Sequence, residues 1–376
     1  MSSNYCPRIF HGMSLHSLTD TSVDYSVCCL TSKTIFGPEI ADDHPVIQNL
    51  RAANKQNLLP YDYCKTCIEQ EASGNHSLRL GFAELHGEPT YDNSIQYLDI
   101  NIDRTCNLAC VSCGPASSTT WRNELRNAGQ EYFKVQTRPQ DLEQFIKKRF
   151  DKLDLSKLRE INIYGGEPFL TNSHVAVLEY IVDLGIANQV RLHYNTNGTQ
   201  RIKDSVKKLM EMFEFVRISF SIDAVGSQFE YIRYGAKWDS VQQTLLWWKN
   251  NLPHNSMLSI TVTVSVLNAL CLNELSKWKH EHFDKTIFGD PIEIISQPAH
   301  LTPVKLENMN TELQDYIKNF NYDPEWKWLK NSSLLAANAG NLEKLLNWLQ
   351  VVDQRRNLNF ALIDPVTSKL LGYSKK

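Results

Sequence analysis

Three cysteines lie close together in the segment NIDRTCNLACVSCGPASS, which covers residues 101–118. They are Cys106, Cys110 and Cys113, and the segment contains no fourth cysteine. Four thiolates would complete a zinc or iron–sulfur site without any other ligand. Three thiolates at C-x3-C-x2-C spacing can instead bind three irons of a cubane cluster and leave the fourth iron without a protein ligand. The triplet therefore predicts a metal centre with one open position, where a ligand can bind and react.

A second group of five cysteines precedes the triplet, and C-x2-C spacing within it is typical of metal binding. These residues can supply the four ligands of a closed iron–sulfur cluster, with a zinc site or no metal at all as the alternatives. Side chains of adjacent residues diverge, so we expect only one member of the CC pair to bind the metal. We favour Cys28 over Cys29 for that place. The group consists of Cys6, Cys28, Cys29, Cys64 and Cys67.

Short β-branched runs alternate with helix-like segments along the middle of the chain. This rhythm is typical of a parallel sheet with right-handed crossovers. Six units predict an α/β fold, a partial (β/α)6 TIM-like barrel over residues 95–300. The strand-like runs are 95–101, 158–164, 190–195, 215–223, 258–266 and 291–296, and the helix-like segments are 117–128, 140–151, 172–184, 199–213, 238–250 and 271–282.

Two further segments flank the expected barrel. Residues 1–75 carry the five early cysteines and little periodic pattern, so we expect an irregular Cys-rich module there. Residues 301–376 have helix-spaced apolar positions, which predict a helical C-terminal extension.

Polar residues alternate with apolar ones along several of the expected strands. In FVRISFSID, Ser219, Ser221 and Asp223 share one face, opposite Val216 and Ile218. If the apolar faces meet the helices, the polar faces point into the barrel, where Val, Ile and Leu are usual. We therefore expect a ligand-binding interior. An antiparallel sheet with one solvated face would also alternate and is the other interpretation.

A glycine-rich turn follows the second expected strand, in INIYGGEPFL. Gly165 and Gly166 let backbone groups approach a ligand closely, and carbonyls together with the Glu167 carboxylate suit an ammonium group. Such a turn also occurs as an ordinary connection from a strand to a helix, with proline in the first helical turn.

The triplet at the end of a first strand, followed in order by GGEP, resembles the radical S-adenosylmethionine (radical SAM) enzymes. The resemblance implies that Cys106, Cys110 and Cys113 bind a [4Fe–4S] cluster whose open iron binds S-adenosylmethionine. It also implies that the GGEP turn binds the amino group of the cofactor. Many members have an aromatic residue before the third cysteine, next to adenine, whereas this chain has Ser112.

Two later segments extend the resemblance. HYNTNGT resembles the TNG segment of the family, and ISFSIDAVG resembles the strand end that meets the ribose and carboxylate of the cofactor. FEYIRYGAKWDSV resembles the segment that carries a cofactor-facing arginine, here Arg233, for which a solvent-exposed position is the alternative. The resemblance thus assigns cofactor contacts to Gly165, Gly166, Glu167, Asn195, Asn197, Ser219, Ser221, Asp223 and Arg233.

The early cysteines resemble the auxiliary-cluster modules called SPASM or twitch domains. Those modules usually follow the barrel, whereas this one precedes it. The resemblance implies a second [4Fe–4S] cluster that relays electrons.

The chemistry implied by the resemblance is reductive cleavage of S-adenosylmethionine to a 5′-deoxyadenosyl radical, which abstracts a hydrogen atom from the substrate. The leading hypothesis is modification of a peptide or protein side chain, with a reducing partner such as flavodoxin or ferredoxin. Modification of a small molecule, sugar or nucleotide is a second hypothesis. A metal-stabilised binding or electron-transfer protein without turnover is a third.

The net charge and hydropathy of the sequence limit the binding partners and the cellular compartment that we expect. The formal charge of −3 predicts no overall attraction to nucleic acid or to an anionic membrane. No run reaches the roughly 18 apolar residues of a membrane span, and the first residues lack the pattern of a signal peptide. We therefore expect a cytoplasmic protein, where thiols stay reduced.

Overall fold

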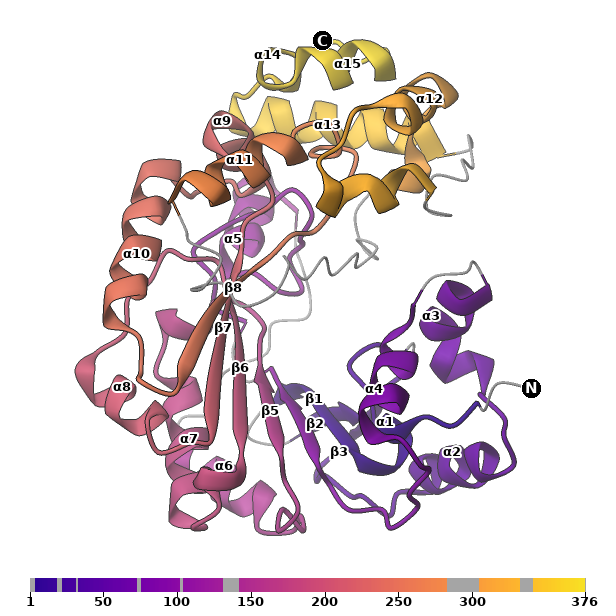
Figure 1. Ribbon diagram of the computed structural model, residues 1–376, viewed down its shortest axis with the longest axis vertical. Coiled ribbons are helices and arrows are strands. Elements are labelled where there is room, and N and C mark those ends of the chain that lie inside the picture. The colour runs from indigo at the N-terminus through magenta and orange to yellow at the C-terminus, as the bar shows by residue number, and fades with distance from the viewer. Residues whose placement is uncertain are drawn as a thin grey trace.

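An eight-stranded sheet forms the centre of the computed structural model, which describes residues 4–18, 22–31, 33–72, 76–101, 104–130, 142–282, 304–331 and 341–375 (Figure 1). The strand order is β3-β2-β1-β4-β5-β6-β7-β8. Strands β1 and β4 to β8 are parallel to one another, and β2 and β3 continue the sheet in antiparallel pairs. The strands are β1 (Gly12–Leu18), β2 (Val23–Ser26), β3 (Ile35–Gly37), β4 (Tyr97–Ile100), β5 (Glu160–Ile163), β6 (Arg191–Thr196), β7 (Phe215–Ser221) and β8 (Ser256–Thr261).

The βα succession confirms the expected α/β fold. Five of the six expected runs overlap β4, β5, β6, β7 and β8, in the predicted order, although β6 ends one residue after its run and β8 begins two residues before its run. The sixth run, 291–296, lies outside the described residues.

The N-terminal residues differ from the irregular module that we expected over 1–75. They contain three strands, and β1 pairs with β4 in parallel, with Met13 opposite Leu98 and Leu15 opposite Ile100. Met13 and Leu15 are fully buried, so this short strand is stabilised by burial against the sheet. Its pattern is too brief to be recognised before its partner strand is known.

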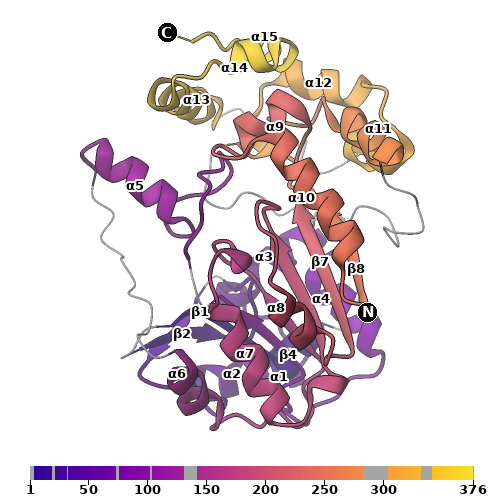
Figure 2. The same ribbon diagram turned by 90° about the vertical axis from the view of Figure 1, so that its left-hand side faces the viewer.

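Helices cover the sheet and close its end (Figures 1 and 2). Helices α6, α7, α8 and α10 cover one face, and α9 and α11 to α15 gather beyond the ends of β7 and β8. No helix in the described ranges is long and apolar enough to cross a membrane. The helices are α1 (Pro7–His11), α2 (Pro45–Lys55), α3 (Tyr61–Ala72), α4 (Leu78–His86), α5 (Thr119–Asn127), α6 (Leu142–Phe150), α7 (Ser173–Asp183), α8 (Asp204–Met210), α9 (Gly226–Ile232), α10 (Trp238–Asn251), α11 (Leu272–His282), α12 (Thr311–Asn319), α13 (Leu342–Arg356), α14 (Phe360–Ile363) and α15 (Pro365–Leu371), with 3-10 turns η1 (Pro168–Leu170), η2 (Ala187–Gln189), η3 (Leu306–Asn308) and η4 (Pro324–Asn331).

The two faces of the sheet differ in polarity. Apolar side chains on one face are buried against the helices; Phe220, for example, contacts Trp248 of α10. The other face carries a row of polar residues that pair across neighbouring strands in the order Ser14, Asp99, Asn162, His193 and Arg217. The alternation in the sequence therefore reflects a parallel sheet with helices on its apolar face.

The N-terminal segment packs on the polar face near β1 and β4. Arg8 forms an ion pair with Asp99, and both side chains are almost fully buried. The guanidinium of Arg8 also lies 5.2 Å from the ring centre of Phe82 in α4. This segment is consequently part of the barrel wall as well as a carrier of cysteines.

Candidate functional site

The cysteine loop, residues 106–113, follows β4 and lies where the parallel strands end. Cys106 and Cys110 are buried, and Cys113 is half-buried. The backbone of the loop pairs with the end of α9 and the residues that follow it: Ala109 N donates to Tyr234 O (2.9 Å) and Val111 N to Ile232 O (2.7 Å). These bonds bring the loop next to Arg233.

Residues at the start of α5 fix the other side of the loop. The Thr119 hydroxyl accepts from Cys106 N (3.0 Å), and the Thr120 hydroxyl donates to Cys106 O (2.7 Å). Ser118 caps α5 by accepting from Trp121 N (3.2 Å), and Trp121 Nε1 donates to Cys110 O (2.8 Å). We did not single out these residues from the sequence, although the run SSTTW directly after the triplet is a recognisable helix start.

Burial determines the protonation of the three thiols. It raises the pKa of Cys106 to about 11 and that of Cys110 to about 12, and it also raises the pKa of Cys113. The positive charge of Arg233 acts in the opposite direction on Cys110 and Cys113. The thiols therefore carry protons that a metal must displace when it binds.

Glu167 of the GGEP turn links the turn to the end of β6. Its backbone N donates to Thr105 O (2.8 Å), next to the cysteine loop. Its carboxylate accepts from the Thr196 hydroxyl (2.7 Å) and from Asn197 N (2.6 Å). Burial raises the pKa of Glu167 to about 7, against the opposing effect of these hydrogen bonds.

Gly165 and Gly166 adopt a backbone conformation that other residues rarely take. Their φ angles are +90° and +51°. A Cβ on Gly165 would lie 2.0 Å from Oδ1 of Asn101. The φ angle therefore favours glycine at position 165, and a Cβ there would force the Asn101 side chain to move.

Of the two predicted asparagines, only Asn197 contacts the cysteine loop. Its Nδ2 donates to Asn107 Oδ1 (3.0 Å) and lies 3.8 Å from the sulfur of Cys106. Asn195 lies on β6 opposite Ser219 of β7. Asn197 therefore lies at the cysteine loop, whereas Asn195 lies within the sheet.

The predicted site residues of β7 also lie at different distances from the end of the strand. Ser219 is fully buried and bonded to His193 Nε2 (2.8 Å) and to Ser259 (2.5 Å), within the polar face. Ser221 is the last residue of β7 and is half-buried. Asp223 lies beyond the strand end, where it accepts from Arg233 Nε (2.9 Å) and Thr263 N (2.8 Å).

Only 12% of the Arg233 side chain is exposed, so the alternative of a solvent-exposed arginine is wrong. Its charge influences Cys110, Cys113 and Glu167. Asn268, which we did not predict, donates to Asp223 O (2.8 Å) and to Thr263 O (3.0 Å). The structure thus brings together the cysteine loop, Glu167, Asn197, Asp223 and Arg233.

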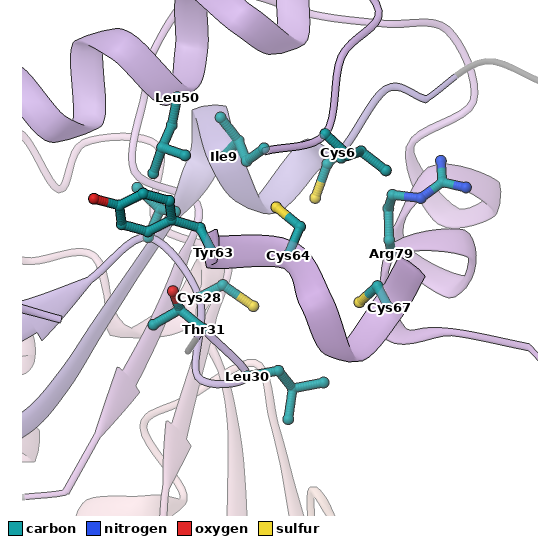
Figure 3. A pocket seen from close by; sticks show the side chains of 12 residues that line it. Cys6, Ile9, Cys28, Leu30, Thr31, Leu50, Tyr63, Cys64, Cys67 and Arg79 are labelled. Atoms are coloured by element: carbon teal, nitrogen blue, oxygen red, sulfur yellow. The ribbon is translucent and has the colours of Figure 1, made fainter. Parts of the chain in front are cut away.

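Four of the five early cysteines line one pocket of about 440 Å³, which includes open solvent at its mouth (Figure 3). They are Cys6, Cys28, Cys64 and Cys67, which come from α3 and from the segments around α1 and after β2; Cys29 is not among the lining residues. Within the described residues, no three His, Cys, Asp or Glu side chains are arranged to bind a single metal ion. The four thiols surround a space instead of meeting at one point.

The thiols of this pocket differ in acidity. Burial raises the pKa of Cys64 to about 12 and also raises that of Cys6. A hydrogen bond from Cys29 lowers the pKa of Cys28 to about 7, so Cys28 is the thiol that loses its proton most easily.

Comparisons with known proteins bear on residues 100–269, which match the family model of the Radical SAM superfamily. No curated protein sequence matches the chain. The chain is similar to a solved structure of native anSMEcpe with bound AdoMet and Cp18Cys peptide, at 17% identity and a TM-score of 0.37, over 75% of this chain and 67% of that one. It is also similar to Streptococcus suis SuiB bound to S-adenosylmethionine, at 15% identity and a TM-score of 0.33, over 58% and 49% of the two chains.

Proposed function

We propose that this chain is a radical SAM enzyme that modifies a side chain of a peptide or protein by abstracting a hydrogen atom. The match of residues 100–269 to the Radical SAM family model supports the enzyme class. The observation that carries the proposal is the buried cysteine loop, fixed at the strand ends beside Arg233 and Asn197. Desolvated thiols beside a specific charge partner are typical of functional sites, and here Arg233 acts on Cys110 and Cys113.

We assign the catalytic [4Fe–4S] cluster to Cys106, Cys110 and Cys113. The donor set fits the cluster because three thiols lie on one loop and no fourth cysteine is near them in the sequence. When bound, the cluster and S-adenosylmethionine supply the electron and the carbon radical that removes a substrate hydrogen. The residues around the cysteine loop would determine which ligand reaches the iron that has no protein ligand.

S-adenosylmethionine would contact the groups around the loop. The carboxylate of Glu167 is already bonded to Thr196 and Asn197, so we assign the ammonium group of the cofactor to the backbone carbonyls of Gly165 and Gly166. Arg233 would bind the cofactor carboxylate, since its hydrogen bond to Asp223 uses only Nε. Ser219, Ser221 and Asn195 lie deeper on the polar face and would face the rest of the ligand.

We assign a second cluster to Cys6, Cys28, Cys64 and Cys67. Four thiols around a pocket suit a cubane better than one zinc ion, which needs sulfurs about 2.3 Å from a single point. Radical SAM enzymes with such auxiliary clusters commonly act on peptides, which is what supports the substrate class. We place the reaction in the cytoplasm, with flavodoxin or ferredoxin as the electron donor.

Anaerobic reconstitution tests both assignments. The full chain should bind about eight irons, four for each cubane, and should release 5′-deoxyadenosine when dithionite and S-adenosylmethionine are added. Cys110→Ala should abolish this release, and Cys67→Ala should lower the iron content by about four while release continues. Cys271→Ala, a change of a thiol outside both groups, serves as the control and should behave like the wild type.

Two results would overturn the proposal. Tightly bound zinc at the triplet, with no cofactor cleavage, would exclude the radical reaction. A mass change in a sugar, nucleotide or other small molecule, with none in any peptide tested, would replace the proposed substrate class with the second hypothesis.

A further inference from the structure

The last helix turn of α13 reaches the cysteine loop from the far end of the chain. In both views α13 lies above α5, beyond the ends of the parallel strands (Figures 1 and 2). Arg356, the last residue of α13, is buried. The C-terminal segment therefore places a buried cation next to the proposed catalytic site.

Arg356 lies between two aromatic rings. Its Cζ is 4.5 Å from the ring centre of Trp121 and 4.4 Å from that of Tyr234. Its Nε donates to Glu124 of α5 (3.1 Å), and only 1% of the Arg356 side chain is exposed. We call these four residues the Arg356 cluster: Arg356, Trp121, Tyr234 and Glu124.

Both rings belong to residues that bond the cysteine loop directly. Trp121 Nε1 donates to Cys110 O, and Tyr234 O accepts from Ala109 N. One guanidinium therefore connects the two supports of the loop, which come from α5 and from the segment after α9. Trp348 of α13 stacks on Trp121 at 5.5 Å and strengthens the same contact.

We propose that Arg356 is a positioning residue for the iron–sulfur cluster: by its contacts with Trp121 and Tyr234 it fixes the backbone around Cys110. This inference rests on the proposed function for the identity of the metal group. The proposal gives the C-terminal helical segment a role in positioning the catalytic site, although none of its residues is assigned as a metal ligand. Partners that orient metal ligands commonly change metal affinity when they are replaced.

Two substitutions at position 356 test the contact. Arg356→Met keeps much of the side-chain length but removes the charge and the planar group. Arg356→Lys keeps the charge and lacks the planar surface that stacks on rings. Arg355→Met is the matched control, because the neighbouring Arg355 bonds Gln130 (2.9 Å) instead of the rings.

The first measurement uses the metal-free chain. Hydrogen exchange of peptides that cover residues 106–113 should accelerate in Arg356→Met and Arg356→Lys, while Arg355→Met should match the wild type. Exchange in β4 to β7 should stay unchanged, which separates a local effect on the loop from general destabilisation.

The second measurement uses the reconstituted chain. Iron loss to a chelator should be about 10- to 100-fold faster in Arg356→Met than in the wild type, measured at a temperature well below the melting transition of both chains. Unaltered exchange and iron retention in this variant, or complete rescue by lysine, would overturn the proposal and leave the proposed function intact.

The two proposals can fail separately. If the wild type binds no cluster, the proposed function fails, and exchange in the metal-free chain still decides whether Arg356 positions the loop. If Arg356→Met does not fold, Tyr234→Leu removes one ring and keeps the backbone oxygen that accepts from Ala109. Faster loop exchange in Tyr234→Leu would support the proposal, and unchanged exchange would overturn it.

Discussion

Desolvation is the main cause of the pKa shifts of the buried titratable side chains around the sheet. Burial raises the pKa of Glu167 to about 7. It also keeps the thiols of the cysteine loop protonated until a metal replaces the protons. Burial has the opposite effect on the bases and lowers the pKa values of His174 and His193 to about 4. The same cause thus keeps these thiols and histidines neutral near pH 7 and leaves Glu167 only partly ionised.

His174 provides a test at the residue scale. Its folded pKa of about 4 lies below the ordinary value of 6.5, so the unfolded chain binds the proton more tightly, and stability is lost as the pH falls from 6.5 toward 4. Between pH 7 and pH 5 the loss from this group should be roughly 2 kcal/mol. In denaturant unfolding of the metal-free chain, the wild type should lose about 2 kcal/mol more stability between the two pH values than His174→Phe does, because His193 contributes its own loss in both chains.

The control for this prediction lies across the hydrogen bond. Tyr194 OH lies 3.0 Å from His174 Nδ1, and Tyr194→Phe removes that bond while keeping the imidazole. It should retain the loss of stability at low pH. An equal loss in His174→Phe would show that another group is responsible.

At the scale of elements, the turn after β5 is the tightest part of the site. Gly165 has a φ of +90° and would bring a Cβ within 2.0 Å of Asn101 Oδ1, at the end of the neighbouring strand β4. This packing places the GGEP turn against the end of β4. A side chain at this position would separate the two.

Gly165→Ala should therefore cost more than a glycine replacement elsewhere. The matched control is Gly185→Ala, where φ is also positive (+73°) but a Cβ would meet nothing within 4 Å. We expect the positive φ angle to lower the free energy of unfolding by about 1 kcal/mol in both variants, and Gly165→Ala to lose more than Gly185→Ala because the Asn101 side chain must also move. Equal losses in denaturant unfolding would contradict the close approach.

At the scale of the whole molecule, both ends of the chain complete the barrel. The N-terminal segment contributes β1 and buries Arg8 against Asp99 of β4. The C-terminal segment places Asp353 where it accepts from Tyr231 in α9 (3.0 Å). The central parallel strands are thus stabilised by segments that are remote in sequence.

The buried ion pair gives the prediction at this scale. Arg8→Met would leave the Asp99 carboxylate buried without its cation, and breaking such a pair typically costs about 3–5 kcal/mol. We expect this loss in denaturant unfolding as one cooperative transition that includes the N-terminal segment. The double variant Arg8→Met/Asp99→Asn should recover part of the loss. Independent unfolding of the first 75 residues would contradict a shared sheet.

The sequence by itself determined the order of strands β4 to β8, the two groups of cysteines and the position of the GGEP turn, because these depend on local periodicity and spacing. Only the tertiary structure decided that β1 belongs to the same sheet, that Cys28 lines the pocket without Cys29, and that Arg233 pairs with Asp223. It also brought Arg356 to the cysteine loop across more than half of the chain. These features depend on contacts between distant segments, and such contacts leave no periodic signal in a single sequence.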